Sequence, residues 1–126
     1  MNLGEKLISI NKKIKLAQSK SCYKNSVKVI GVTKTHPFSF IEESYKSNIY
    51  SIGENKVQEM VGKFNEMPKD IKWHMIGNLQ RNKVKYIASF VHLIHVVDSL
   101  KLLKEINKQA QKNERIIECL LSLIHI

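Results

Sequence analysis

Lys34 is the side chain in this sequence with the clearest capacity for covalent chemistry. It ends the β-rich segment 27–34, where alternation places it on the face of Ile30 and Val32, at the mouth of a predicted sheet. An amine attacks an aldehyde only when neutral, and an unperturbed lysine, with a pKa of about 10.4, is almost wholly protonated at pH 7. Partly apolar walls and neighbouring lysines favour the neutral amine. Lys34 is therefore a candidate nucleophile, although a lysine extended into solvent is the plainer interpretation.

Polar residues also follow the other predicted strands. They are Gly53-Glu54-Asn55, Gly77-Asn78 and Asp98-Ser99. Ligands of α/β proteins bind at the carboxyl ends of parallel strands, so these residues and Lys34 would share one edge. Helix caps need the same residue types, so the pattern alone does not define a ligand.

The histidines do not have the spacing of a metal site. His92 and His95 are three apart on a predicted strand and would face opposite sides of it. His74 follows Trp73 and is typical of a packed histidine. We expect no zinc site. The sequence also lacks a Walker loop, a dinucleotide-binding glycine motif and the common hydrolase motifs.

The elements that must position these side chains alternate between strands and helices. Periodicity predicts an amphipathic helix over 2–19 and strands over 27–34, 50–53, 72–77, 91–97 and 116–126. Crossover helices begin near Pro37, at a capping box of Asn55 and Gln58, at Leu79, and at Asp98 or Ser99. The helix over 79–90 is followed by one with an apolar face of Leu100, Leu103, Ile106 and Ala110. This order predicts a parallel sheet, either doubly wound or part of a (β/α)8 barrel.

Composition and charge exclude several classes of protein. The chain has 126 residues, no apolar run long enough for a membrane span and no secretory signal at its start. Cys22 and Cys119 are far apart, which indicates free thiols in a reducing compartment and predicts a cytoplasmic protein without a membrane partner. The net charge of +10 is spread along the chain. Nucleic-acid binding is therefore a minor alternative.

Four motifs at these strand ends resemble those of the pyridoxal phosphate homeostasis protein family. They occur in the family's order and with its gaps, over residues 27 to about 121. The motifs are Gly31-Val32-Thr33-Lys34-Thr35-His36-Pro37, Gly53-Glu54-Asn55-Lys56-Val57-Gln58-Glu59, Trp73-His74-Met75-Ile76-Gly77-Asn78-Leu79-Gln80-Arg81-Asn82-Lys83 and Ile94-His95-Val96-Val97-Asp98-Ser99. The first differs from the family's usual Val-Ser-Lys-Thr in having threonine in place of serine.

The resemblance implies a fold and a cofactor. The fold is a (β/α)8 barrel like the N-terminal domain of alanine racemase, here a partial barrel of about five parallel strands over 27–126, with residues 1–26 forming an N-terminal helix packed on it. The cofactor is pyridoxal 5′-phosphate (PLP), held as a Schiff base on Lys34, with Asn55, His74 and Met75 near it. Family members are PLP-binding proteins of vitamin B6 homeostasis without efficient catalysis, so we expect no enzyme.

The chain is shorter than the family pattern, and this bears on function. The phosphate-binding glycines and the partner of the pyridine nitrogen are expected beyond the matched region, so we expect the isolated chain to be unstable and to bind PLP weakly. A complete protein is expected to be a monomer with PLP as its partner and no nucleic acid. The alternatives are a PLP enzyme of the alanine racemase type, which needs an acid or base opposite Lys34, and a basic nucleic-acid-binding module.

Overall fold

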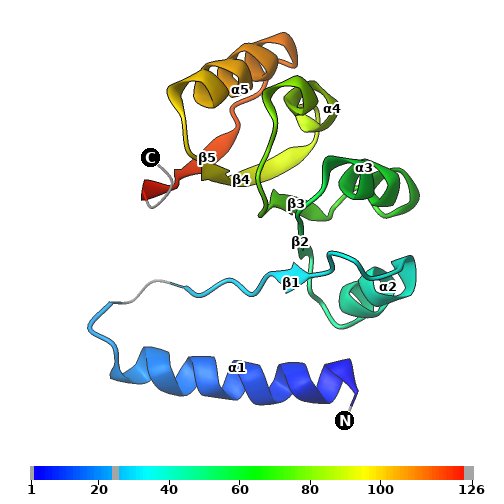
Figure 1. Ribbon diagram of the computed structural model, residues 1–126. Coiled ribbons are helices and arrows are strands. Elements are labelled where there is room, and N and C mark those ends of the chain that lie inside the picture. The colour runs from blue at the N-terminus through cyan, green and yellow to red at the C-terminus, as the bar shows by residue number, and fades with distance from the viewer. Residues whose placement is uncertain (1, 24–25, 124–126) are drawn as a thin grey trace.

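One parallel sheet, joined by helical crossovers, organises the computed structural model, which describes residues 2–23 and 26–123 (Figure 1). The elements are α1 (Leu3–Lys20), β1 (Gly31–Val32), α2 (Phe38–Lys46), β2 (Ser51–Glu54), α3 (Val57–Glu66), β3 (Lys72–Met75), the 3-10 helix η1 (Arg81–Lys83), α4 (Val84–Ile87), β4 (Val91–Val97), α5 (Leu100–Lys112) and β5 (Glu118–Leu121).

The order of the strands decides between the two predicted architectures. The strands lie in the order β1-β2-β3-β4-β5, and every neighbouring pair is parallel. Helices α2, α3, α4 and α5 all lie on the same, convex side of the strands (Figure 1). A doubly wound sheet would reverse its strand order and carry helices on both faces. The prediction of a partial (β/α)8 barrel with an N-terminal helix is therefore confirmed.

The core lies between the strands and helices α2 to α5. Alternation along β2 and β3 turns every second side chain toward the helices, where Ile52, Trp73 and Met75 are fully or almost fully buried. Each fully buried aliphatic side chain contributes about 1.5–3 kcal/mol to folding. The core residues with no more than 2% exposure include Ile41, Ile52, Met60, Trp73, Met75, Val84, Ile87, Val91, Ile94, Val97 and Ile106.

Helix α1 lies apart from this core. Its start has the capping box of Asn2 and Glu5, in which the Glu5 N–H donates to Asn2 Oδ1 at 2.8 Å. No described residue of α1 is buried. Of the partly buried side chains that pack against the core cluster, Leu7 is the one that belongs to α1 among the described residues. The division of the chain into residues 1–26 and 27–126 stays a prediction.

Several predicted element boundaries are wrong. The segment 27–34 forms a strand only at Gly31–Val32, because it pairs with β2 alone among the described residues. The helix predicted over 79–90 is reduced to η1 and the one-turn α4. The fifth strand covers Glu118–Leu121, and residues 124–126 of its predicted range lie outside the described part of the chain.

Two predicted helix details also need correction. Asn55 does not cap α3, whose N-cap is Lys56 without a side-chain hydrogen bond. In α5, Ser99 Oγ accepts from the Leu102 N–H, as predicted for a cap. This start turns Leu102 toward the sheet and leaves Leu100 and Leu103 exposed, at 64% and 37%. The predicted apolar face of α5 is correct only for Ile106 and Ala110.

Within the described residues, no helix is both long enough and apolar enough to cross a lipid bilayer.

Candidate functional site

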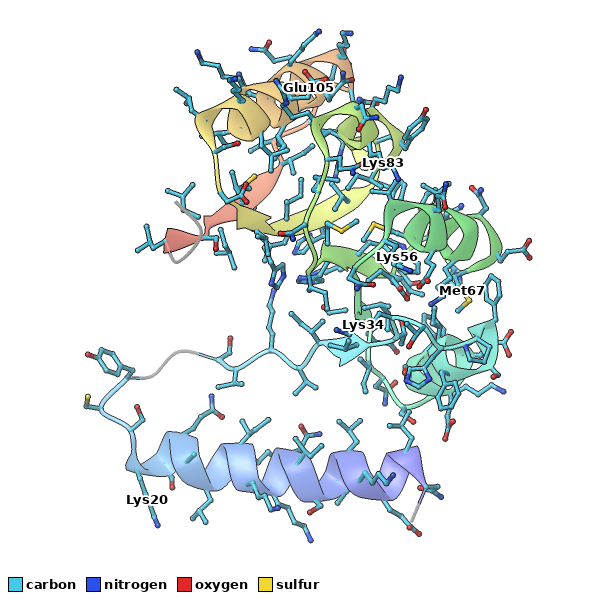
Figure 2. All side chains as sticks on the ribbon, in the orientation of Figure 1. Lys20, Lys34, Lys56, Met67, Lys83 and Glu105 are labelled. Atoms are coloured by element: carbon cyan, nitrogen blue, oxygen red, sulfur yellow. The ribbon has the colours of Figure 1, made fainter. Side chains whose placement is uncertain are left out.

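Lys34 lies in a tight turn directly after β1, at the edge of the sheet where the parallel strands end. Figure 2 shows Lys34 and Lys56 at the ends of the neighbouring strands β1 and β2. The Lys34 side chain is exposed and forms no hydrogen bond or ion pair with any described residue. The ε-amine is therefore accessible to a ligand from solvent, and its exposure agrees with the plainer interpretation of a lysine extended into solvent.

A hydrogen bond within the backbone closes this turn, which we call the Lys34 turn (residues 33–36). The His36 N–H donates to the Thr33 carbonyl at 3.0 Å, and the Thr33 N–H donates to the Gly53 carbonyl of β2 at 3.1 Å. Thr35 has φ of 64°, in the left-handed region that a β-branched residue rarely adopts. The turn is thus closed, joined to β2 and strained one residue after Lys34.

A buried ion pair lies beneath the Lys34 turn. Glu54 is fully buried and Lys63 is 7% exposed, and Lys63 Nζ lies 2.5 Å from Glu54 Oε1. The Thr33 hydroxyl donates to the same carboxylate oxygen at 2.5 Å, and Lys63 Nζ donates to the Thr33 carbonyl at 2.9 Å. A carboxylate and an ammonium group therefore both bind the residue that precedes Lys34.

Asn55 lies at the same edge, one residue beyond Glu54. Its Oδ1 is buried and has no hydrogen-bond partner in the described part of the chain. Gly77 packs against it so closely that a Cβ on Gly77 would lie 2.6 Å from Asn55 Cβ and 2.7 Å from its carbonyl oxygen. Glycine is therefore required at position 77.

His74 lies deeper, on the face of the sheet opposite the helices. It is 3% exposed, its Nδ1 lies 2.9 Å from His95 Nε2, and its own Nε2 has no partner among the described residues. Burial, followed by the nearby His95, His92, Lys28 and Lys72, lowers the pKa of His74 to about 4. His74 is therefore neutral at pH 7, with one buried ring nitrogen available to a ligand.

The prediction that His92 and His95 face opposite sides of their strand is wrong. Both rings contact His74, with centroid distances of 5.3 Å for His92 and 5.1 Å for His95. The pairing of β3 with β4 shifts register between Trp73 and His74, which breaks the simple alternation along β4. Burial lowers the pKa of both His92 and His95. No group of three potential metal-binding side chains occurs within the residues that the structure describes.

Met75 lies in the core and not at the open edge. It pairs with Glu54 on one side and Ile94 on the other, in the row of side chains that faces the helices, and it is fully buried. The structure thus brings Lys34 and Asn55 to one edge, places His74 below that edge on the opposite face, and separates Met75 from them by the sheet. A cofactor contact by Met75 stays a prediction.

Sequence reasoning missed Thr33, Glu54 and Lys63 as a buried group. Lys63 follows Met60 by three residues, on the face of α3 that packs against the sheet. A lysine at a core position of a helix, preceded by an acid at the end of the adjoining strand, was the signal for a buried ion pair.

Comparisons with known proteins agree with the motifs. No family model matches the chain. The chain is 38% identical over 125 residues to the pyridoxal phosphate homeostasis protein of Aquifex aeolicus, covering 98% of this chain and 55% of the relative. It is 32% identical over 127 residues to the protein of the same name from Haemophilus influenzae, covering 98% of this chain and 54% of that relative. The chain thus spans about half the length of the curated relatives it matches.

Solved structures give the same result. The structure of PipY from Synechococcus elongatus without PLP matches with a TM-score of 0.80 and 30% identity, over 94% of this chain and 52% of PipY. The structure of PipY with PLP bound matches with a TM-score of 0.70 and 34% identity, over 83% of this chain and 50% of PipY. The predicted resemblance to the pyridoxal phosphate homeostasis proteins is thereby confirmed along almost the whole of this chain.

Proposed function

We propose that this chain carries the lysine-bearing half of a PLP site in a protein of PLP homeostasis. The single observation that carries the proposal is Lys34, an exposed amine at the carboxyl edge of a partial barrel that has no hydrogen-bond or ion-pair partner among the described residues. This is the edge at which barrels of this kind bind ligands. The relative PipY, whose fold this chain shares, has been solved with PLP bound.

The described residues fit such a cofactor. Lys34 would hold it through a Schiff base, because a bound PLP supplies an aldehyde carbon that a primary amine attacks with loss of water. The buried and unpartnered Asn55 Oδ1 and His74 Nε2 are available for polar contacts. An unsatisfied buried polar atom costs about 1–3 kcal/mol, so a ligand that satisfied either atom would be favoured.

The same residues support a carrier and not an efficient enzyme. Efficient proton transfer needs an acid or base positioned near the reacting atoms. Glu54 is held by Lys63 and Thr33, and His74 is paired with His95. Among the described residues, no acid or base forms a hydrogen bond or ion pair with the Lys34 amine. We infer that PLP is bound and buffered at this site without rapid turnover.

We also propose a cytoplasmic, monomeric complete protein that does not bind nucleic acid. Cys22 is an exposed free thiol and Cys119 a half-buried one, as expected in a reducing compartment. The basic residues are spread over the elements of the fold, and no nucleic-acid-binding motif accompanies them.

The test is a titration of the chain with PLP, followed by borohydride reduction and peptide mapping. The expected result is a visible absorption band and a pyridoxyl group on Lys34. Lys34→Arg, which keeps the charge but forms no Schiff base, should abolish this label. Lys56→Arg, at the matching position after β2, is the control and should leave it unchanged. Labelling of Lys34 that is no greater than that of Lys56 would show the proposal to be wrong.

A further inference from the structure

We propose that Glu54, Lys63 and Glu59 are positioning residues that hold the Lys34 turn in the conformation in which Lys34 reaches the cofactor. The inference rests on the proposed function of Lys34. None of the three residues needs to touch the cofactor, since each acts on the backbone or side chain of Thr33 or Thr35.

Besides the backbone bond from Thr33 to Gly53, three side-chain contacts join the Lys34 turn to β2 and α3. Glu54 Oε1 accepts from the Thr33 hydroxyl at 2.5 Å, and Lys63 Nζ donates to the Thr33 carbonyl at 2.9 Å. On the far side of Lys34, the Thr35 N–H donates to Glu59 Oε2 at 3.3 Å. Lys34 is thus flanked by two residues that are both bound from α3 or the end of β2.

The strained backbone of the turn indicates that these contacts hold it in place. Thr35 has φ of 64°, and a β-branched residue keeps this conformation only where surrounding contacts impose it. The turn follows a strand of only two residues, Gly31–Val32, which by itself fixes little of the backbone. The contacts of Glu54, Lys63 and Glu59 therefore restrain the direction of Lys34 together with the backbone bonds of Thr33 to Gly53 and His36.

Burial of the ion pair argues for a geometric role. Desolvation of two charges offsets most of their attraction, so a well-packed apolar pair at the same place would stabilise the fold about as well. An apolar pair could not bind the Thr33 hydroxyl and carbonyl. What Glu54 and Lys63 add to the molecule is therefore the fixed position of Thr33.

The test uses the double variant Glu54→Leu/Lys63→Met of the full chain. Removal of both charges leaves no unpaired buried ion, so the variant should keep the far-ultraviolet circular dichroism of the parent. Without the contacts to Thr33, we expect faster hydrogen exchange at the Thr35 and His36 amides in the absence of PLP. We also expect the yield of pyridoxyl-Lys34 after borohydride reduction to fall at least about tenfold, as for a displaced reacting group.

The matched control is Lys56→Met/Glu66→Leu, which removes the same charges from exposed positions beside and on α3 and should change neither measurement. Two milder variants keep the test decisive if the double variant does not fold. Glu59→Ala should expose the Thr35 amide and lower Lys34 labelling, whereas Lys63→Arg, which keeps a charged donor, should retain most of the labelling.

The outcomes separate this inference from the proposed function. A parent chain without pyridoxyl-Lys34 refutes the proposed function, whatever the exchange data give. Unchanged amide protection, or unchanged Lys34 labelling, in the folded double variant overturns the positioning role. If the double variant does not fold, unchanged protection of the Thr35 amide or unchanged Lys34 labelling in Glu59→Ala overturns the positioning role. A loss of labelling in Lys63→Arg as large as that in Glu59→Ala overturns it as well.

Discussion

At the scale of single residues, the most unusual environment is that of His74. Its ring is almost completely buried on the open face of the sheet, next to two other histidines and near two lysines. A protonated His74 would be an unsolvated charge among positive neighbours, which is why its pKa is lowered to about 4. The neutral ring is a packed side chain and a possible ligand contact at the same time.

This environment predicts loss of stability in mild acid. Between pH 6.5 and pH 4 the unfolded chain binds a proton at His74 that the folded chain does not, so the free energy of unfolding falls as the pH falls through this range. The expected loss from His74 is about 2 kcal/mol after partial solvent screening. Urea unfolding at several pH values measures it.

In the variant His74→Gln, unfolding should take up about one proton fewer in that range than in the parent. The free energy of unfolding should therefore change less with pH. His36→Gln, at an exposed position in the Lys34 turn, is the control and should keep the parent's dependence. Equal pH dependence in the parent and His74→Gln would contradict the assignment.

At the scale of elements, Arg115 joins the last helix and strand to the rest of the sheet. It lies in the connection between α5 and β5, and its guanidinium donates to the Ala88 carbonyl at 2.6 Å and to the Val91 carbonyl at 2.8 Å. Ala88 is the C-cap of α4 and Val91 is the first residue of β4, so the two carbonyls flank the turn that leads from α4 into β4. One side chain therefore satisfies the backbone of a turn that α4, with a single helical turn, cannot complete.

Replacement of Arg115 should loosen this connection. We expect Arg115→Met to lower the free energy of unfolding by about 2 kcal/mol, because two carbonyls lose charged donors while the aliphatic packing is kept. Arg81→Met, at an exposed position of η1, should have little effect. Denaturant unfolding of the two variants provides the measurement, and equal midpoints would show that Arg115 does not stabilise the turn.

At the scale of the whole molecule, β5 forms one edge of the sheet, and apolar side chains in and beside this strand are exposed to solvent. Within the described residues it pairs with β4 alone. Leu121 in β5 is 63% exposed, and Ile116 before the strand and Leu123 after it are 93% and 77% exposed. Unpaired backbone groups next to apolar side chains are a template for association between copies of a chain. The chain spans 55% and 54% of the length of the two relatives described above.

We therefore expect the isolated chain to self-associate through β5. Leu121→Lys should shift light scattering at a given concentration toward that of a monomer, since a charge on an edge strand opposes pairing. Leu100→Lys, at a position of α5 with 64% exposure, tests whether any added charge has this effect. Equal reduction by both variants would assign the change to net charge and not to the edge.

The sequence by itself determined the order of the elements, a helix cap at Asp98 or Ser99, and the position of Lys34 and Asn55 at one edge of the sheet. These features follow from local periodicity and from residue types that a turn or cap requires. The tertiary structure decided which predicted strand residues pair, because the length of β1 depends on its neighbour. It also decided that Glu54, Lys63 and Thr33 meet, and that His92 and His95 share a face. The contacts of Thr33 with Glu54 and Lys63 join residues 21 and 30 positions apart, and the shared face of the two histidines depends on a shift in strand register. Local periodicity specifies neither of these.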